Sequence, residues 1–392
     1  MNRLFPFLFA LTCLISMLHA ETPAETGIRV AAAEIAKSPG SYEYYNDLAL
    51  AFARRAQETC DASNYQKAEE ALARSFAIAP DNFDGLKVRA LVLLGQHEFA
   101  KALELATRLN KQMPDDIVIY GYLAEANEEL GNYKDAATAA QWMLRIRPGN
   151  AAGLAVAGEL REVLGYIAPA MEVTRMAYDL TPGQETETRA ELLVRMARLN
   201  LLAGDLPKAE TYATTAVDVF PGYPDGLAAL ADVRTAQRRY DEAVVLQRKR
   251  YEEAPRAAHL YALGEALTRA GQKAEANAVF AEFEEKALAE SDEADNANRE
   301  LIAWYIDFAN RPEDALRIAE KEIARRHDVF TIDSYAWALA ATGDLPRASV
   351  EIQKAVATGV KDPQILRHAA AIARRLGATA GDMGELFGGQ GK

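Results

Sequence analysis

The chain has 392 residues, of which 50% are hydrophobic and 26% are charged. These fractions are typical of a folded protein and exclude an intrinsically disordered one. The formal net charge of −13 argues against a nucleic-acid partner, because phosphate recognition needs clustered lysine and arginine.

The beginning of the chain has the pattern of a secretory signal peptide. A short basic start at residues 1–3 precedes an apolar run at residues 4–18, and Ala20 supplies a small residue at the cleavage point. The run is short for a membrane span, and an uncleaved anchor is the alternative. We therefore expect residues 1–20 to be removed and the protein to be periplasmic or secreted.

The two cysteines predict neither a lipid anchor nor an internal disulfide. Thr12 precedes Cys13 where a lipoprotein signal needs a smaller residue, so we expect no lipid anchor. Cleavage leaves Cys60 without a second cysteine in the chain. Pairing of Cys60 between two chains stays open beside the interpretation of an unreactive, half-buried thiol.

The next segment, residues 21–39, is predicted to cap the first repeat of the stack. Residues 21–25 have no helical signal and are expected to be loose. A single helix from Ile28 to Lys37, ended before Pro39, is expected to cover the first repeat.

A period of 34 residues dominates residues 40–377. Alanine recurs at this interval, and proline follows each alanine at a fixed offset of twelve residues. The members are Ala68, Ala102, Ala136 and Ala170 with Pro80, Pro114, Pro148 and Pro182, and then, after an insertion of five, Ala209, Pro221, Ala243 and Pro255. This period is typical of a helix–turn–helix unit that stacks on its neighbours because it cannot bury its apolar face alone.

One unit, residues 117–148, shows why these residues recur. Gly131 can adopt the left-handed conformation that ends a first helix. Ala136 allows the second helix to cross closely, and Pro148 prevents that helix from continuing. Tyr133 supplies bulk between adjacent units, as do its counterparts Tyr65, Phe99 and Tyr240.

The segment Leu130-Gly131-x-Tyr133-x-x-Ala136 resembles the tetratricopeptide repeat family. Degenerate units continue the frame to a final helix, Pro363 to Leu376, which is expected to close the stack. The resemblance implies an all-α fold, an α-solenoid of about nine tetratricopeptide helix-turn-helix repeats that form a superhelix, with capping helices at both ends. Residues 40–377 then form one continuous domain.

Three irregularities interrupt the pattern. About seven extra residues lie between the helices of the first unit at residues 54–64, and five more lie near residues 183–187. The third is the acidic stretch at residues 290–295, for which we expect a solvated linker, with a calcium loop as the alternative. The glycine-rich end, residues 378–392, is expected to be a flexible tail.

No combination of residues points to catalysis, a cofactor or a metal site. The four histidines beyond the signal segment fall in different repeats and form no metal-binding pair: His97, His259, His327 and His368. There is no nucleophile elbow, phosphate-binding glycine loop or CxxC motif. We therefore predict that the protein is not an enzyme and uses no cofactor.

The resemblance also implies that the first helix of each unit lines a concave groove. One inward position is held in successive units by Leu91, Glu125, Glu159, Arg198, Asp232, Glu265, Trp304 and Trp337. Four of these eight are acidic, which favours a basic partner; a solvated helix face on an acidic protein is the alternative. The carboxylate-clamp arrangement of lysine and asparagine known in this family is absent.

Two tryptophans end this inward series. Trp304 and Trp337 lie 33 residues apart, with Glu300, Asp333 and Tyr335 nearby. They could grip an aromatic or proline-rich segment, or they could be core residues of the last units, which we consider the better interpretation.

We predict from these patterns an exported, non-catalytic scaffold that binds a protein or peptide, with assembly of an envelope complex as one use. Two alternatives stay open: a self-associating structural solenoid, and a soluble binder of small ligands or cations.

Overall fold

A computed structural model describes residues 21–378 of the chain as helices joined by short loops. The helices are α1 (Pro23–Lys37), α2 (Tyr42–Thr59), α3 (Ser63–Ile78), α4 (Phe83–Gly95), α5 (Phe99–Gln112), α6 (Ile117–Glu129), α7 (Tyr133–Ile146), α8 (Ala151–Val163), α9 (Ile167–Leu180), α10 (Thr186–Leu202), α11 (Leu206–Val219), α12 (Pro224–Ala236), α13 (Tyr240–Glu253), α14 (Ala257–Arg269), α15 (Lys273–Glu290), α16 (Asn298–Asp307), α17 (Pro312–Ile323), α18 (Val329–Thr342), α19 (Leu345–Ala357) and α20 (Pro363–Arg375). The expected signal segment, and the expected tail beyond residue 378, lie outside the described residues. No helix between residues 21 and 378 has the length and hydropathy needed to span a membrane.

Helices α2 to α19 pack as successive antiparallel pairs, each an even-numbered first helix followed by an odd-numbered second helix. Within residues 21–378 there are nine such pairs, flanked by α1 and α20. The predicted all-α solenoid of tetratricopeptide-like units is confirmed.

The alanine of the repeat lies where the two helices of a unit cross. The nine members of the series are no more than 2% exposed: Ala68, Ala102, Ala136, Ala170, Ala209, Ala243, Ala276, Ala315 and Ala348. A larger side chain at any of them would push two backbones apart. Gly131, in the turn of its unit, has the left-handed conformation that its place in the pattern predicts (φ 78°).

The prediction that residues 21–25 are loose is wrong. Helix α1 begins at Pro23, because Thr22 caps it and forms a capping box with Glu25. The buried carboxylate of Glu58 in α2 accepts hydrogen bonds from the Thr22 hydroxyl (2.6 Å) and from the Ala24 backbone N–H (3.2 Å). These bonds fix the start of α1 against the first unit.

The extra residues of the first unit lengthen a helix and do not form a loop. Helix α2 has 18 residues and runs to Thr59, where Cys60 ends it in a left-handed conformation (φ 51°). Cys60 is a half-buried free thiol, and burial raises its pKa to about 12. The side chain is therefore protonated and unreactive at neutral pH.

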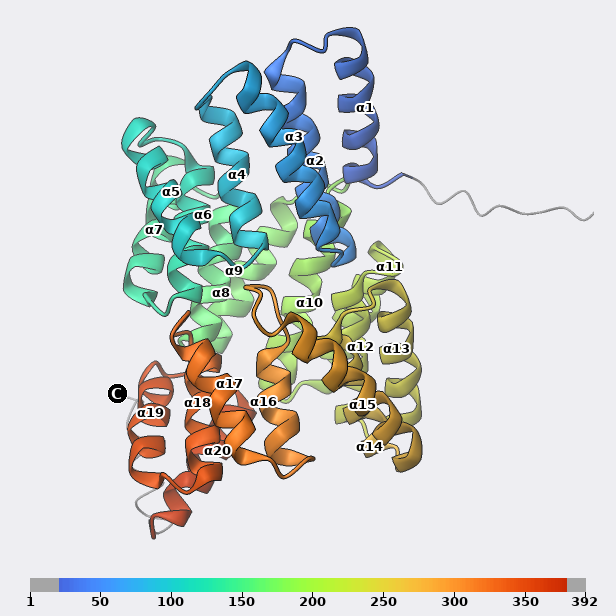
Figure 1. The fold of residues 1–392 in the computed structure, drawn as a ribbon, viewed down its shortest axis with the longest axis vertical. Coiled ribbons are helices and arrows are strands. Elements are labelled where there is room, and N and C mark those ends of the chain that lie inside the picture. Colours follow the sequence, from blue (N-terminus) through green and yellow to red (C-terminus); the bar gives the residue numbers. More distant parts are fainter. Residues whose placement is uncertain (1–20, 379–392) are drawn as a thin grey trace, which may run out of the picture.

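The stack of units winds into a superhelix that returns on itself. Helices α16 to α20 come to lie below α4 to α9, after the chain has passed through α10 to α15 (Figure 1). The backbone N–H of Val329, the first residue of α18, donates a hydrogen bond of 2.8 Å to the hydroxyl of Tyr133 in α7. The two halves of the chain therefore touch across a separation of 196 residues.

Candidate binding groove

The inner face of the second half holds a cavity of about 880 Å³. It is lined by the inward faces of first helices from α10 to α18 and by α20. Six of the nine predicted site residues lie in its wall: Arg198, Asp232, Glu265, Glu300, Asp333 and Trp337. We call this cavity the C-terminal groove.

Arginines lie among the carboxylates of the C-terminal groove. They are Arg198, Arg269, Arg299, Arg367 and Arg374. The guanidinium groups of Arg198 and Arg299 lie 5.8 and 5.4 Å from the ring centre of Phe330. Since Arg198 belongs to α10 and Phe330 to α18, the contact between these two residues crosses the groove. The wall is thus of mixed charge around an aromatic side chain.

Three charges of the groove make no direct ion pair, although opposite charges lie near them, such as Glu300 beside Arg299 and Arg198 beside Asp232. Among the described residues, Asp232, Glu300 and Arg299 make no ion pair within 4 Å. Asp232 is accessible to solvent but surrounded by protein, and this burial raises its pKa, although Arg250, Arg198 and Arg269 oppose the shift. Accessible charges without a direct partner in the wall of a cavity favour a ligand that carries the opposite charges.

Trp337 forms a rigid edge of the groove. Its ring stacks on the imidazole of His368, with centroids 4.3 Å apart and planes inclined by 5°. Nδ1 of His368 lies 2.9 Å from a carboxylate oxygen of Asp333, and the indole N–H of Trp337 donates to Asp307 at 3.3 Å. The side chain is therefore held in place by both ring stacking and a hydrogen bond.

Trp304, by contrast, does not line the C-terminal groove. Its ring stacks on Phe280 at 4.5 Å and on Phe308 at 5.7 Å, and it packs against the main hydrophobic core. The core interpretation holds for Trp304, while Trp337 lines the groove. Tyr335 is also a core residue, with 9% exposure.

Glu125 and Glu159 lie in the first half of the inner face, outside the C-terminal groove. They belong to a set of six carboxylates, which we call the acidic wall: Glu125, Glu128, Glu129, Glu159, Glu187 and Glu191. Glu125 is open to solvent, yet protein surrounds it, and this burial together with Glu159, Glu129 and Glu191 raises its pKa to about 8. Burial likewise raises the pKa of Glu187 to about 8 and that of Glu129 to about 7.

The acidic stretch at residues 290–295 is exposed at Asp292 and Glu293, as expected of a solvated linker, but other parts of the chain also hold it in place. Helix α17 holds it: Lys321 donates to the carbonyl of Ser291 at 2.6 Å, and Arg325 donates to that of Asp292 at 2.7 Å. Asp295 pairs with Arg256 and lies 3.4 Å from Nδ1 of His97. No group of metal-binding side chains occurs within residues 21–378.

Sequence reasoning missed several residues of the C-terminal groove, chiefly Phe330, Arg299, Asp307 and His368. A partial signal existed, because the inner face of a first helix carries more than one position. Phe330 precedes Trp337 by seven residues, which is two helical turns on the same face. Only the superhelical winding, which the repeat pattern does not encode, brings Phe330 opposite Arg198.

No protein-family model and no curated protein sequence matches the chain. Solved structures do resemble it. Cut9 in the APC/C hetero-tetramer Cut9–Hcn1 has 12% identity over 88% of this chain, at a TM-score of 0.49, and this chain spans 58% of that one. PilW, a type IV pilus biogenesis factor, has 18% identity over 53% of this chain and 92% of its own, at a TM-score of 0.44.

The match to a third structure extends over most of both chains. Human IFIT1, solved as a dimer with PPP-AAAA, has 12% identity over 86% of this chain and 91% of its own, at a TM-score of 0.52. At such low identity the likeness concerns the fold alone. Together with the nine helix pairs, it shows that the chain has the fold of a tetratricopeptide-like α-solenoid.

Proposed function

We propose that the protein is a non-catalytic scaffold that binds an extended segment of a partner protein in the C-terminal groove. The observation that carries this proposal is the set of unpaired charges beside fixed aromatic side chains in a cavity of about 880 Å³. Asp232 and Arg299 are exposed to solvent and Glu300 is partly exposed, so an incoming segment can reach these charges and pair with them. A bound segment would supply both the counter-ions and an apolar side chain.

The chemistry of the partner segment follows from the two parts of the inner face. An aromatic or branched apolar residue fits between Phe330 and Trp337. A carboxylate suits Arg299, and lysine or arginine suits Asp232 and the neighbouring acidic wall. The partner segment is therefore one that combines basic residues with at least one aromatic residue.

Selection from a phage-displayed library of random dodecapeptides tests this proposal. We expect the selected peptides to share an aromatic residue and a basic residue. A synthetic copy of one of them should lose about tenfold or more in affinity when Trp337→Ala removes a central anchor. Titration of the labelled peptide by fluorescence anisotropy measures the change.

The matched control is Trp142→Ala. Trp142 is 42% exposed on α7, a second helix, and lies outside the C-terminal groove. Trp142→Ala should leave peptide affinity unchanged. Equal losses in the two variants, or full affinity in Trp337→Ala, would contradict the groove assignment.

We also propose that the scaffold acts after export from the cytoplasm. The signal pattern of residues 1–20 supports this step. Protein recovered from the envelope fraction should begin at Glu21 when its N-terminus is sequenced, and a chain that begins at Met1 would show that the segment is retained.

A further inference from the structure

A line of contacts joins the two halves of the superhelix. Three turns within units of the first half, α4–α5, α6–α7 and α8–α9, meet the three loops α15–α16, α17–α18 and α19–α20 of the second half. We call this line the seam. Its residues are His97, Glu129, Gly131, Tyr133 and Gly165 on one side and Asp295, Arg326, His327, Val329 and Gly359 on the other.

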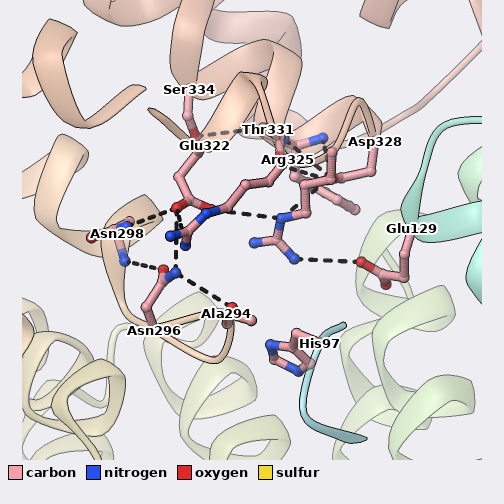
Figure 2. A network of polar contacts seen from close by, with 12 residues as sticks. His97, Glu129, Ala294, Asn296, Asn298, Glu322, Arg325, Asp328, Thr331 and Ser334 are labelled. Atoms are coloured by element: carbon pink, nitrogen blue, oxygen red, sulfur yellow. Dashed lines mark hydrogen bonds and ion pairs between the residues drawn. The ribbon is translucent and has the colours of Figure 1, made fainter. Parts of the chain in front are cut away.

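The first two of these three turns make polar contacts across the seam. At the α4–α5 turn, Nδ1 of His97 lies 3.4 Å from Asp295. At the α6–α7 turn, Arg326 lies 3.5 Å from Glu129, next to the hydrogen bond from Val329 to Tyr133. Figure 2 shows Glu129 and His97, both from the first half, facing the loop and helix of the second half. Each polar group thus meets a partner from the opposite half.

Two glycines allow close backbone contact across the seam at the α6–α7 and α8–α9 turns. A Cβ atom on Gly131 would overlap the carbonyl of His327, and one on Gly165 would overlap the carbonyl of Gly359. Gly204 and Gly271 hold the same turn position in other units with nearly the same φ, 78° and 77°, but nothing lies within 4 Å of a Cβ placed there. The close approach is therefore a property of the seam and not of the repeat.

The seam is a weaker contact than the stacking of units. The largest hydrophobic core runs along the stack from Val244 to Ile372. Among the described residues of the first half, Tyr133 and Val163 are the apolar side chains that pack against it, and both are partly buried. A largely polar contact of this kind can open while each half stays folded.

Helix α18 links the seam to the C-terminal groove. Its first residue, Val329, makes the bond to Tyr133, and its next residue, Phe330, lines the groove. Trp337 follows on the same helix. Any opening of the seam therefore releases the end of the helix that carries both aromatic side chains.

We propose that the seam is an autoinhibitory closure that keeps the superhelix wound around the C-terminal groove, and that it opens to admit a partner segment. This inference rests on the function proposed above. The closed seam holds α18 in place and encloses the inner face. Opening widens the groove and lets a segment enter from the side.

Two double variants of the seam, compared with one control pair, test the closure. Gly131→Ala with Gly165→Ala puts a methyl group into each backbone contact, whereas Gly204→Ala with Gly271→Ala carries the same backbone strain in open space. We expect a larger radius of gyration by small-angle X-ray scattering in the seam pair alone, with helix content matched by circular dichroism. Tyr133→Phe with Arg326→Gln gives a milder second variant that removes polar contacts and adds no bulk.

Affinity for the library-selected dodecapeptide tests the regulatory part. If the open form is a minor population of about 10%, releasing the seam raises the apparent affinity by up to about tenfold. The opposite change locks the seam closed. Cysteines replace Glu129 and Arg326 in a chain whose native cysteines are replaced by serine, and a short bis-maleimide joins the two new thiols. Cross-linking should slow peptide association relative to the same chain before reaction.

Each arm has a result that overturns the inference. Equal radii for the two glycine pairs would show that the seam does not hold the superhelix closed. An expanded seam pair with wild-type affinity, or a cross-linked chain that binds at the original rate, would show that closure does not control binding. Failure to select any peptide would instead count against the proposed function, while the scattering comparison would still decide whether the seam is a closure.

Discussion

Replacing Glu322 by alanine is expected to lower the free energy of unfolding by about 3 kcal/mol, because it breaks a buried polar network. Glu322 is 4% exposed. It accepts hydrogen bonds from Asn298 at 2.7 Å, and from Asn296 and Arg325 at 3.3 Å each (Figure 2). Removal of this carboxylate takes one acceptor from the buried amide of Asn298 and one each from the more accessible side chains of Asn296 and Arg325.

Glu320→Ala is the matched control for this change. Glu320 is exposed on the same helix, α17, and its loss should alter stability by no more than about 0.5 kcal/mol. Urea unfolding followed by circular dichroism measures both variants. Equal stability of the two would mean that the network contributes nothing to holding α16 and α17 together.

The second large effect is expected for Arg195→Met, which removes the cation nearest the acidic wall. The Arg195 side chain is 16% exposed and lies 2.9 Å from Glu159, 3.6 Å from Glu162 and 4.0 Å from Glu191. Its loss leaves these carboxylates to repel one another, but the side chains of Glu159 and Glu191 are 43% and 51% exposed, and solvent screens their repulsion. We therefore expect a loss of about 1–2 kcal/mol in the free energy of unfolding at pH 9.

This loss should shrink as the pH falls. The pKa of Glu191 is raised by burial, as are those of Glu125 and Glu187, both about 8. The folded chain therefore binds more protons than the unfolded chain between the unfolded pKa near 4.5 and the folded values, so stability declines as pH rises through this range. Arg195→Met should steepen that decline.

Thermal unfolding at pH 7 and pH 9 measures the effect. Burial lowers the pKa values of His97 and His259, so these histidines make stability rise with pH only at more acidic pH. At pH 7 and pH 9 they do not mask the decline caused by the carboxylates. Arg175→Met is the control, since Arg175 and Asp179 form an exposed surface pair worth well under 1 kcal/mol. A deficit in Arg195→Met that does not change with pH would argue against repulsion in the acidic wall.

The repeat pattern predicted the elements of the fold but not their winding. Alanine and glycine recur because each unit needs a close helix crossing and a left-handed turn, and both are local requirements. The pattern therefore located Ala136 and Gly131 correctly. The second role of Gly131, against the carbonyl of His327, depends on the sum of small rotations between units and leaves no periodic trace.

The candidate site was predictable to a similar extent. The inward position placed Arg198, Asp232 and Trp337 together, because one face of each first helix points to the superhelix axis. The same rule placed Trp304 inward, but Phe280 of α15 stacks on its ring within the core. The second helices decide which aromatic side chains of the first helices are buried. The repeat pattern does not describe the faces that these second helices turn toward the first helices.

The most direct test of the groove is photo-cross-linking of the selected dodecapeptide. A photoreactive benzoylphenylalanine replaces Gln364, an exposed residue in the wall of the C-terminal groove, or Trp142 on α7 as the control. We predict a saturable cross-link from position 364 that excess unlabelled peptide abolishes, and none from position 142. A cross-link from position 142 with none from position 364 would place the peptide on the outer face and contradict the account.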